Sequence, residues 1–299
     1  MIKAGCWGKN HCQLHRFFGW KDVKLQKHAP FSVSAADCFV SDTSLRGKVE
    51  ISTDEIAAHP EYMCDAGIME WDLTIDKQIA FNVGYGASRL FRAIKAFEMY
   101  WHAEGMKTQY NGTVTLNGTR YTVRPESSYG YADKNWGRGF TSPWVWLSSN
   151  CMKSNITGKQ LTNSVFDIGG GRPKIYFAAL DRKLLGAFYH EGTEYEFNFS
   201  KFWQLPRTKF TFKENDTYVL WHVRQENRTA VIDVKVRCKK KDMLLVNYEA
   251  PDGTKRHNKL WNGGNGTGRI KLYKKNNGTL QLIDDISVTH IGCEYGEYN

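Results

Sequence analysis

Residues 110–123, YNGTVTLNGTRYTV, decide the fold class of this chain. Two Asn-Gly pairs, Asn111-Gly112 and Asn117-Gly118, flank a short run of threonine, valine and leucine and precede a second alternating run. Asn-Gly supplies the positive φ angles that tight hairpins need, and β-branched residues favour strands. The stretch therefore predicts antiparallel strands joined by tight turns.

Comparable strand-like runs, bounded by turn residues, recur along the C-terminal half, for example TEYEFNFSKFWQL, TAVIDVKVRC and RIKLYKKNNGTLQLI. Helical periodicity is scarce. The helix candidates are TDEIAAH at residues 53–59 and SRLFRAIKAFEM at residues 88–99, and the second stretch also fits a strand. So many short strands predict an all-β protein built from one or two antiparallel barrels or sandwiches.

A chain of 299 residues is long for one core and sufficient for two. The aromatic run in the middle of the sequence ends near residue 154, and a new series of hairpins begins there. We therefore expect an N-terminal β domain over residues 1–153 and a C-terminal β domain over residues 154–299. No linker rich in proline or serine separates them, which favours two closely packed halves.

The composition is that of a folded protein, with 41% hydrophobic residues, 14% aromatic residues and a net charge of +10. No stretch has eighteen consecutive apolar residues, and the first residues lack the apolar segment of an export signal. We therefore expect a cytoplasmic protein without stable membrane insertion. The seven scattered cysteines favour reduced thiols over a disulfide framework. The densest basic run, KVRCKKKDM at 235–243, favours a solvated turn over nucleic-acid binding, because no nucleic-acid-binding motif accompanies it.

The most unusual stretch is residues 129–150, YGYADKNWGRGFTSPWVWLSSN, which places one carboxylate, Asp133, among two tyrosines and three tryptophans. If residues 129–136 form a strand, its period of two places Tyr131, Asp133 and Asn135 on one face. The second half of the stretch presents a similar mixed face, made by Trp144, Trp146, Ser148 and Asn150.

Large aromatic side chains with a few polar groups are typical of a ligand cavity, whereas a packed core is aliphatic. Burial in such a cavity raises the pKa of a carboxylic acid, which can then donate a proton near neutral pH. The alternative interpretation of Asp133 is a structural ion pair with Lys134 or Arg138 that holds a hairpin together.

The residues from Asp133 to Asn150 resemble the signature of the tocopherol cyclase-like family, in which an acidic residue is followed by K-[ND]-W-G, F-P and W-x-W-x-Q-x-N. The matching residues are Asp133 to Gly137, Phe140, Pro143, Trp144, Trp146 and Asn150. Shorter matches lie at Phe17 to Trp20, at Met99 to Gly105, which includes Trp101, and at Gly292 to Gly296. Together these markers span nearly the whole chain.

The resemblance implies two lipocalin-like antiparallel β-barrel domains packed together, with few short helices. It also implies a relation to carotenoid hydratases and to fungal proteins that guide pericyclic cyclisations. The reaction that it implies is proton-triggered closure of a prenyl chain onto a phenol, with no cofactor and no metal. The partner would be a small hydrophobic molecule.

In this reaction Asp133 would supply the proton, because protonating an alkene needs a strong, desolvated acid. Tryptophan faces would stabilise the resulting cation. The resemblance assigns the orientation of a polar head group to Asn135, Arg138 and Asn150. The substrate would contact Tyr131, Trp136, Trp144, Trp146, Ser148, Asn150 and Trp101.

Three departures from the family pattern argue against transferring the plant substrate to this chain. Ser148 stands where the family has glutamine, and the acid is Asp133 where glutamate is more frequent. The F-P pair is opened to Phe140-Thr141-Ser142-Pro143. A shorter acid and a smaller hydroxyl side chain imply altered pocket dimensions, and no plastid-type transit peptide is recognisable.

A second aromatic and polar group lies in the C-terminal half, at Trp221-His222 and Trp261-Asn262. His222 fits either a second base or a core histidine, and Trp261-Asn262 could close the pocket. The glycine clusters at 169–171 and 263–268 match no phosphate loop and favour hairpin or barrel-corner turns. The spacing of cysteines and histidines over residues 6–15 does not fit a zinc site.

Three functions remain open from the sequence. The first is a cofactor-independent cyclase, hydratase or isomerase that protonates an alkene in an aromatic pocket. The second is a lipocalin-like carrier of a hydrophobic ligand, because that architecture also serves carriers. The third is a carbohydrate-binding or glycan-active β protein, although a glycosidase usually needs two carboxylates.

Overall fold

The computed structural model describes residues 1–7, 11–26, 28, 30–81, 89–137, 141–176, 178–180, 183–246 and 259–297. Nearly all regular structure in these residues is β, so the all-β prediction is confirmed. The helices are short: α1 (Thr53–Ala58) and α3 (Arg89–Ala93), with 3-10 turns at Trp20–Asp22, Pro60–Tyr62, Phe202–Gln204 and Lys240–Asp242. No helix among the described residues has the length and apolar character needed to cross a membrane.

The chain forms two compact units that do not follow a single boundary in the sequence. The first contains residues 1–6, 10–79 and 107–131, and the second contains residues 7–9, 80–106 and 132–299. The boundary expected between residues 153 and 154 lies inside β12 (Cys151–Ser154), within the second unit. The division into domains at that point stays a prediction.

The first unit is an antiparallel sheet with the strand order β9-β8-β7-β6-β5-β4-β3, accompanied by the hairpin β1-β2. Its small core contains Leu14, Val49, Ile51 and Met69. The strands are β1 (Ile2–Cys6), β2 (Cys12–Arg16), β3 (Val23–Gln26), β4 (Ser32–Ala35), β5 (Cys38–Ser41), β6 (Ser44–Ile51), most of β7 (Gly67–Phe81), the second half of β8 (Met99–Leu116), and β9 (Thr119–Val123).

Of the two turns expected in residues 110–123, one is confirmed and one is wrong. Asn117 and Gly118 have φ angles of 48° and 81° and connect β8 to β9 as a tight hairpin. Gly112 instead lies within β8, where an added Cβ would sit 2.1 Å from the carbonyl oxygen of Asp72. This glycine therefore serves the close approach of a neighbouring strand, which the local sequence does not reveal.

The helix predicted at residues 53–59 is confirmed as α1. Ser52 caps it, because the Ser52 Oγ accepts a hydrogen bond of 3.1 Å from the Glu55 N–H. The second candidate, at residues 88–99, forms a helix only over Arg89–Ala93, and Met99 begins β8. The basic run at 235–243 forms a turn only over Lys240–Asp242, since its first five residues continue β21.

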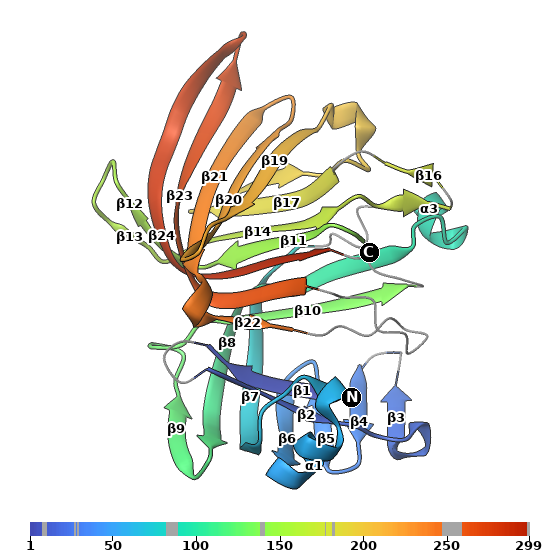
Figure 1. The fold of residues 1–299 in the computed structure, drawn as a ribbon. Coiled ribbons are helices and arrows are strands. Elements are labelled where there is room, and N and C mark those ends of the chain that lie inside the picture. The colour runs from blue at the N-terminus through green and yellow to red at the C-terminus, as the bar shows by residue number, and fades with distance from the viewer. Residues whose placement is uncertain are drawn as a thin grey trace. The chain divides into compact units, whose positions relative to one another are not determined.

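The second unit contains a 12-stranded sheet with the order β18-β17-β14-β11-β24-β23-β21-β20-β19, to which β12, β13 and β22 attach. Its longest strands are visibly curved (Figure 1). The strands are β11 (Trp144–Ser149), β12, β13 (Gln160–Leu161), β14 (Ser164–Gly171), β17 (Lys183–His190), β18 (Thr193–Phe197), β19 (Arg207–Glu214), β20 (Tyr218–Glu226), β21 (Ala230–Lys239), β22 (Met243–Leu245), β23 (Lys259–Asn276) and β24 (Thr279–Glu297). The unit also holds β10 (Gly130–Gly137) from Ala132 onwards, the first half of β8, and the pair β15 (Lys174–Ile175) and β16 (Ala178–Ala179).

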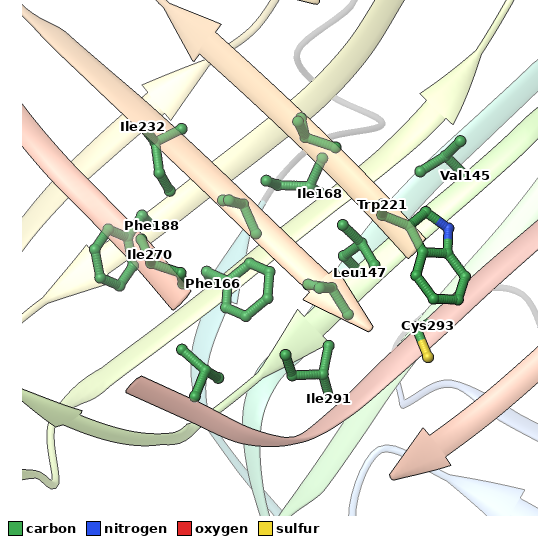
Figure 2. Close-up of a cluster of buried hydrophobic side chains, with 14 of the residues drawn as sticks. Val145, Leu147, Phe166, Ile168, Phe188, Trp221, Ile232, Ile270, Ile291 and Cys293 are labelled. Atoms are coloured by element: carbon green, nitrogen blue, oxygen red, sulfur yellow. The ribbon is translucent and has the colours of Figure 1, made fainter. Parts of the chain in front are cut away.

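The main hydrophobic core lies on one face of this sheet (Figure 2). Alternation along the strands produces it: Val145 and Leu147 of β11 point into the core, and Trp221 and Val223 of β20 do the same. The side chains between them point to the other face. The curved sheet therefore presents a second face, opposite the core.

The glycine clusters do not form the hairpins expected from the sequence. Residues 169–171 lie in β14, and residues 263–268 lie in β23, with register shifts between Gly263 and Gly266 and between Gly266 and Gly268. Gly171 is the last residue of β14, and the second cluster lies within β23. The role of these glycines therefore depends on the atoms that pack against them.

We expect Leu147→Ala to lower the free energy of unfolding by about 2–5 kcal/mol, because the side chain is fully buried and its loss leaves a cavity. The matched control is Leu220→Ala on the outer face of β20, where the leucine is 37% exposed and the cost should stay below about 1 kcal/mol. Urea unfolding measures both values. Equal costs for the two variants would contradict the placement of the core.

Candidate functional site

The candidate site lies on the face of the second unit's sheet that is opposite the core. One row of paired residues crosses the sheet there, and it consists of Asn262 on β23, Glu294 on β24, Trp146 on β11 and Gly169 on β14. Trp144 lies two residues from Trp146 on the same face. We call this surface the indole face.

Glycines on the indole face make room for the tryptophan rings. A Cβ on Gly169 would lie 2.7 Å from the ring of Trp101, which reaches the sheet from β8. A Cβ on Gly292 would lie 2.6 Å from the ring of Trp146. Real Cβ atoms do not approach this closely, so only glycine admits the two indoles at these positions. This close packing explains Gly169, whereas an added Cβ on Gly170 or Gly171 would approach a backbone carbonyl oxygen, that of Lys183 or Pro143 respectively.

Asp133 on β10 is held by the indole of Trp101. Trp101 Nε1 donates a hydrogen bond of 2.8 Å to Asp133 Oδ2, and Asn135 Nδ2 donates a weaker one of 3.3 Å to the same oxygen. Asp133 is exposed as a residue, but protein atoms surround its carboxyl group, and this local burial governs its ionisation. Burial raises the pKa of Asp133, and the two hydrogen bonds oppose the rise.

Lys134 does not neutralise Asp133. Its ammonium group forms an ion pair with Glu104 on β8 instead. Among the described residues, no lysine, arginine or histidine forms an ion pair with Asp133, and Arg138 lies outside them. The structure thus does not support the ion pair with Lys134 as the role of Asp133.

Glu294 is a second carboxylate on the indole face. Trp144 Nε1 donates a hydrogen bond of 2.8 Å to Glu294 Oε2, and Asn262 Nδ2 donates one to Oε1. The indole of Trp221 fixes the backbone of the same residue by donating to its carbonyl oxygen at 3.2 Å. Only 8% of Glu294 is exposed, and this burial raises its pKa to about 7. When Asp133 is ionised, its negative charge contributes to this rise.

The sequence did not reveal Glu294 as a site residue, although it lies in the Gly292 to Gly296 stretch that resembles the family's C-terminal ending. A local signal exists there: the acid alternates with Gly292 and Gly296 on one strand face, which leaves space for the ring of Trp146 at Gly292 and for Leu260 at Gly296. The pairing of β11 with β24 then brings it next to residues that precede it by about half the chain.

Two tryptophans of the site are in direct ring contact. The rings of Trp101 and Trp144 meet edge to face, with centroids 6.2 Å apart and an interplanar angle of 81°. Such an arrangement stabilises both rings. Trp146 Nε1 donates a hydrogen bond of 3.0 Å to Asp167, which is fully buried. Trp136 stacks on Tyr100 at 5.6 Å and is 42% exposed.

A small cavity of about 60 Å³ adjoins the two interlocked indoles. It is far smaller than the pockets of about 300–1,000 Å³ that enclose drug-sized ligands. Asp133 and Glu294 are not among its lining residues, which are mainly apolar: Phe97, Met99, Tyr100, Trp101, Thr141, Trp144, Gly170, Pro173, Lys183, Leu185, Phe199 and Ser200.

The structure brings part of the predicted site together. Asp133, Asn135 and Trp101 contact one another, and Trp144, Trp146 and Asn262 share the indole face. Trp136 stacks beside this group on Tyr100, and Arg138 lies outside the described residues.

The remaining predicted residues lie elsewhere or have structural contacts. His222 on β20 pairs with Asp233 on β21 at 3.1 Å. Trp261 packs against the main core. The hydroxyl of Ser148 is buried and donates to the carbonyl oxygen of Phe166, so it fixes the sheet. Asn150 follows β11 and is half-buried, and Tyr131 belongs to the first unit.

We expect Gly169→Ala to destabilise the protein by about 1–3 kcal/mol, because the added methyl group overlaps the buried ring of Trp101. Gly19→Ala is the control, since the nearest atom to its Cβ would be a flexible carboxylate oxygen of Asp22 at 3.3 Å. Urea unfolding of both variants tests this. If Gly169→Ala were as stable as the control, the close packing of Trp101 would be refuted.

Glu294→Gln tests the raised pKa of Glu294 through stability. The folded-state value of about 7 lies above the ordinary 4.5, so ionisation costs the folded protein free energy. The contribution of protonated Glu294 to the free energy of unfolding is therefore complete below the ordinary pKa of 4.5. It is lost as the pH rises through the folded-state pKa of about 7. Between about pH 5 and pH 8 the wild type should lose roughly 3 kcal/mol relative to Glu294→Gln.

The measurement is urea unfolding of both proteins across this pH range. Glu214→Gln is the control, because Glu214 lies on the edge strand β19, in an ion pair with Lys240 at 3.0 Å. Parallel stability curves for the wild type and Glu294→Gln would rule out the raised pKa.

Two curated plant proteins match part of the chain. The chloroplastic tocopherol cyclase of Zea mays is 28% identical over 147 residues, which are 48% of this chain and 27% of that protein. The probable chloroplastic tocopherol cyclase of Oryza sativa subsp. japonica is 26% identical over 157 residues, 51% of this chain and 30% of that protein. The matches thus span less than a third of these relatives' length.

Among solved structures, the crystal structure of kievitone hydratase from Nectria haematococca is similar with a TM-score of 0.46 and 12% identity, covering 89% of this chain and 74% of that one. The sequence profile of the tocopherol cyclase-like family matches residues 40–297, which include the indole face, Asp133 and Glu294. This match extends over most of the sequence and agrees with the resemblance seen around Asp133. The chain belongs to the tocopherol cyclase-like family.

Proposed function

We propose that this protein is a cofactor-independent cyclase, hydratase or isomerase that protonates an alkene in a small hydrophobic substrate, prenylated, polyene or aromatic. The observation that carries the proposal is the position of Asp133. Its carboxyl group is bound by an indole N–H, has a raised pKa, and forms no ion pair with a cation among the described residues. Burial without a cationic partner favours the protonated form of a carboxylic acid.

The tryptophans support the next step of this chemistry. Transfer of the Asp133 proton to one alkene carbon forms a C–H bond and leaves a carbocation at the other carbon. Aromatic faces attract such a cation, and Trp101 and Trp144 present two rings at the site in an edge-to-face arrangement. Their N–H groups are bound to carboxylates, so the rings are held in place before substrate arrives.

The last step joins an oxygen to the cation. If the oxygen belongs to a phenol of the same substrate, the product is a cyclic ether and an isomer of the substrate. If it belongs to water, the product is a hydrate. In both reactions the oxygen loses one proton, so no proton is consumed overall. The names of the plant relatives and of the hydratase agree with these two outcomes and motivate the proposal.

A surface platform for sugars receives less support from the geometry. Trp144 and Trp146 are half-buried, and each donates its indole N–H to a carboxylate of the protein. A stacking platform leaves the ring face open to solvent. A carrier would bind its ligand at the same site and would differ only in lacking turnover. Experiment therefore has to separate the two alternatives.

The test begins with the purified protein incubated in an extract of its source cells, and native mass spectrometry identifies the small molecule that it retains. We expect a prenyl or polyene compound that the wild type converts into an isomer or a hydrate. Asp133→Asn should bind this compound within a few-fold of the wild type and lose turnover by a factor of about 100 or more, the usual effect of removing a general acid.

Asp216→Asn, in the exposed turn before β20, is the matched control and should retain the turnover of the wild type. A retained compound that the wild type leaves unchanged would favour the carrier. Full turnover by Asp133→Asn would reject Asp133 as the proton donor.

A further inference from the structure

We infer that Glu294 is a second catalytic group of the site, and that Asp133 and Glu294 form a pair that holds one proton between them. In the reaction one carboxyl group delivers the proton and the other carboxylate takes up the proton that the attacking oxygen loses. This inference rests on the proposed function for its chemistry, whereas the pairing of the two carboxylates is argued from their contacts with the two tryptophans.

The geometry places both acids on one pair of interlocked rings. Asp133 accepts the N–H of Trp101, Glu294 accepts the N–H of Trp144, and these two rings are in edge-to-face contact at 6.2 Å. The charge of Asp133 acts on the ionisation of Glu294. Two carboxylates that repel each other in a poorly solvated site cannot both ionise easily, so the pair retains one proton to higher pH than a single acid.

Hydrogen bonding distinguishes the two members of the pair. Both oxygens of Glu294 accept N–H donors, from Trp144 and from Asn262, and this arrangement suits a carboxylate. The orientation of the Asn262 amide is fixed in turn, because its Oδ1 accepts the N–H of Trp7 at 2.9 Å. The two donors of Asp133 share Oδ2, and no described residue donates to Oδ1. Asp133 Oδ1 is therefore the oxygen suited to carry the proton to substrate.

The resulting sequence of steps balances. The O–H bond at Asp133 breaks as a C–H bond forms on the alkene, and both carboxylates are then negative and face the carbocation. The hydroxyl of the substrate, or water, forms the new C–O bond, and its proton moves to Glu294. The pair ends with one proton, as it began, and transfer of that proton to Asp133 restores the starting state. No oxidant, reductant or metal enters the balance.

Other charged groups on the neighbouring strands are engaged or lie on a different part of the site. Lys134 and Glu104 pair with each other, and Asp167 accepts the N–H of Trp146. Lys183 lines the small apolar cavity, whose lining does not include Glu294. None of these side chains forms an ion pair with either acid in the described part of the chain.

Carbon-13 NMR of labelled aspartate and glutamate carboxyl groups tests the pairing without any substrate. In the wild type the two groups should titrate in two steps, the upper one with a midpoint near the pKa of about 7 given by Glu294. In Asp133→Asn and in Glu294→Gln the surviving acid should titrate below that upper midpoint, because its charged neighbour is gone. Glu214→Gln should leave both midpoints unchanged.

An upper midpoint that persists unchanged in either single variant would overturn the pair. Circular dichroism and thermal unfolding establish that each variant is folded, and the two variants test the same claim independently. A structural role of Glu294 alone would shift the thermal midpoint of Glu294→Gln and leave the titration of Asp133 where it is in the wild type.

Turnover of the compound retained from the cell extract separates this inference from the proposed function. We expect Glu294→Gln to lose turnover by a factor of about 100, as expected for removal of a general base. Loss of turnover in Asp133→Asn combined with full turnover in Glu294→Gln would overturn the role of Glu294 and leave the proposed function intact. A wild type without turnover whose carboxyl groups nevertheless titrate as a pair would refute the proposed function only.

Discussion

The indole N–H bonds to Asp133 and Glu294 are the interactions on which the candidate site depends. The bond to Asp133 requires the ring of Trp101 to pack closely on the sheet, and a side chain at Gly169 would prevent this. The sheet therefore has glycine at selected positions, and the space beside these glycines is occupied by tryptophan rings on its second face. The core on the first face makes this possible, because it stabilises the strands without help from the indole face.

The placement of two acids on an apolar, ring-covered surface costs stability, and the raised pKa of each acid expresses that cost. Natural proteins accept such costs where the chemistry needs them. A solvated or ion-paired carboxylate gives up its proton at low pH, whereas a buried one bound by neutral donors retains it. The same feature that weakens the folded protein at neutral pH favours the protonated form of these acids, which the proposed alkene protonation needs.

The sequence predicted what depends on local patterns and missed what depends on distant pairing. The all-β class, the turn at Asn117-Gly118 and the acid Asp133 follow from neighbouring residues. Glu294 joins Trp144 across 150 positions of sequence, and only the pairing of β11 with β24 brings them together. The role of Gly169 in β14 was missed for the same reason, because the ring of Trp101 that requires it belongs to β8. His222 was expected in the pocket, but it lies on β20, which three strands separate from β11, and it pairs with Asp233.

Neutron diffraction from crystals grown in D₂O near neutral pH tests the central claim most directly, because it locates the hydrogen positions on carboxyl oxygens. The account predicts one deuteron on the pair formed by Asp133 and Glu294, together with deuterated indole nitrogens directed at Asp133 Oδ2 and Glu294 Oε2. Two carboxylates without any deuteron would contradict it, because the site would then hold no acid able to protonate an alkene at this pH.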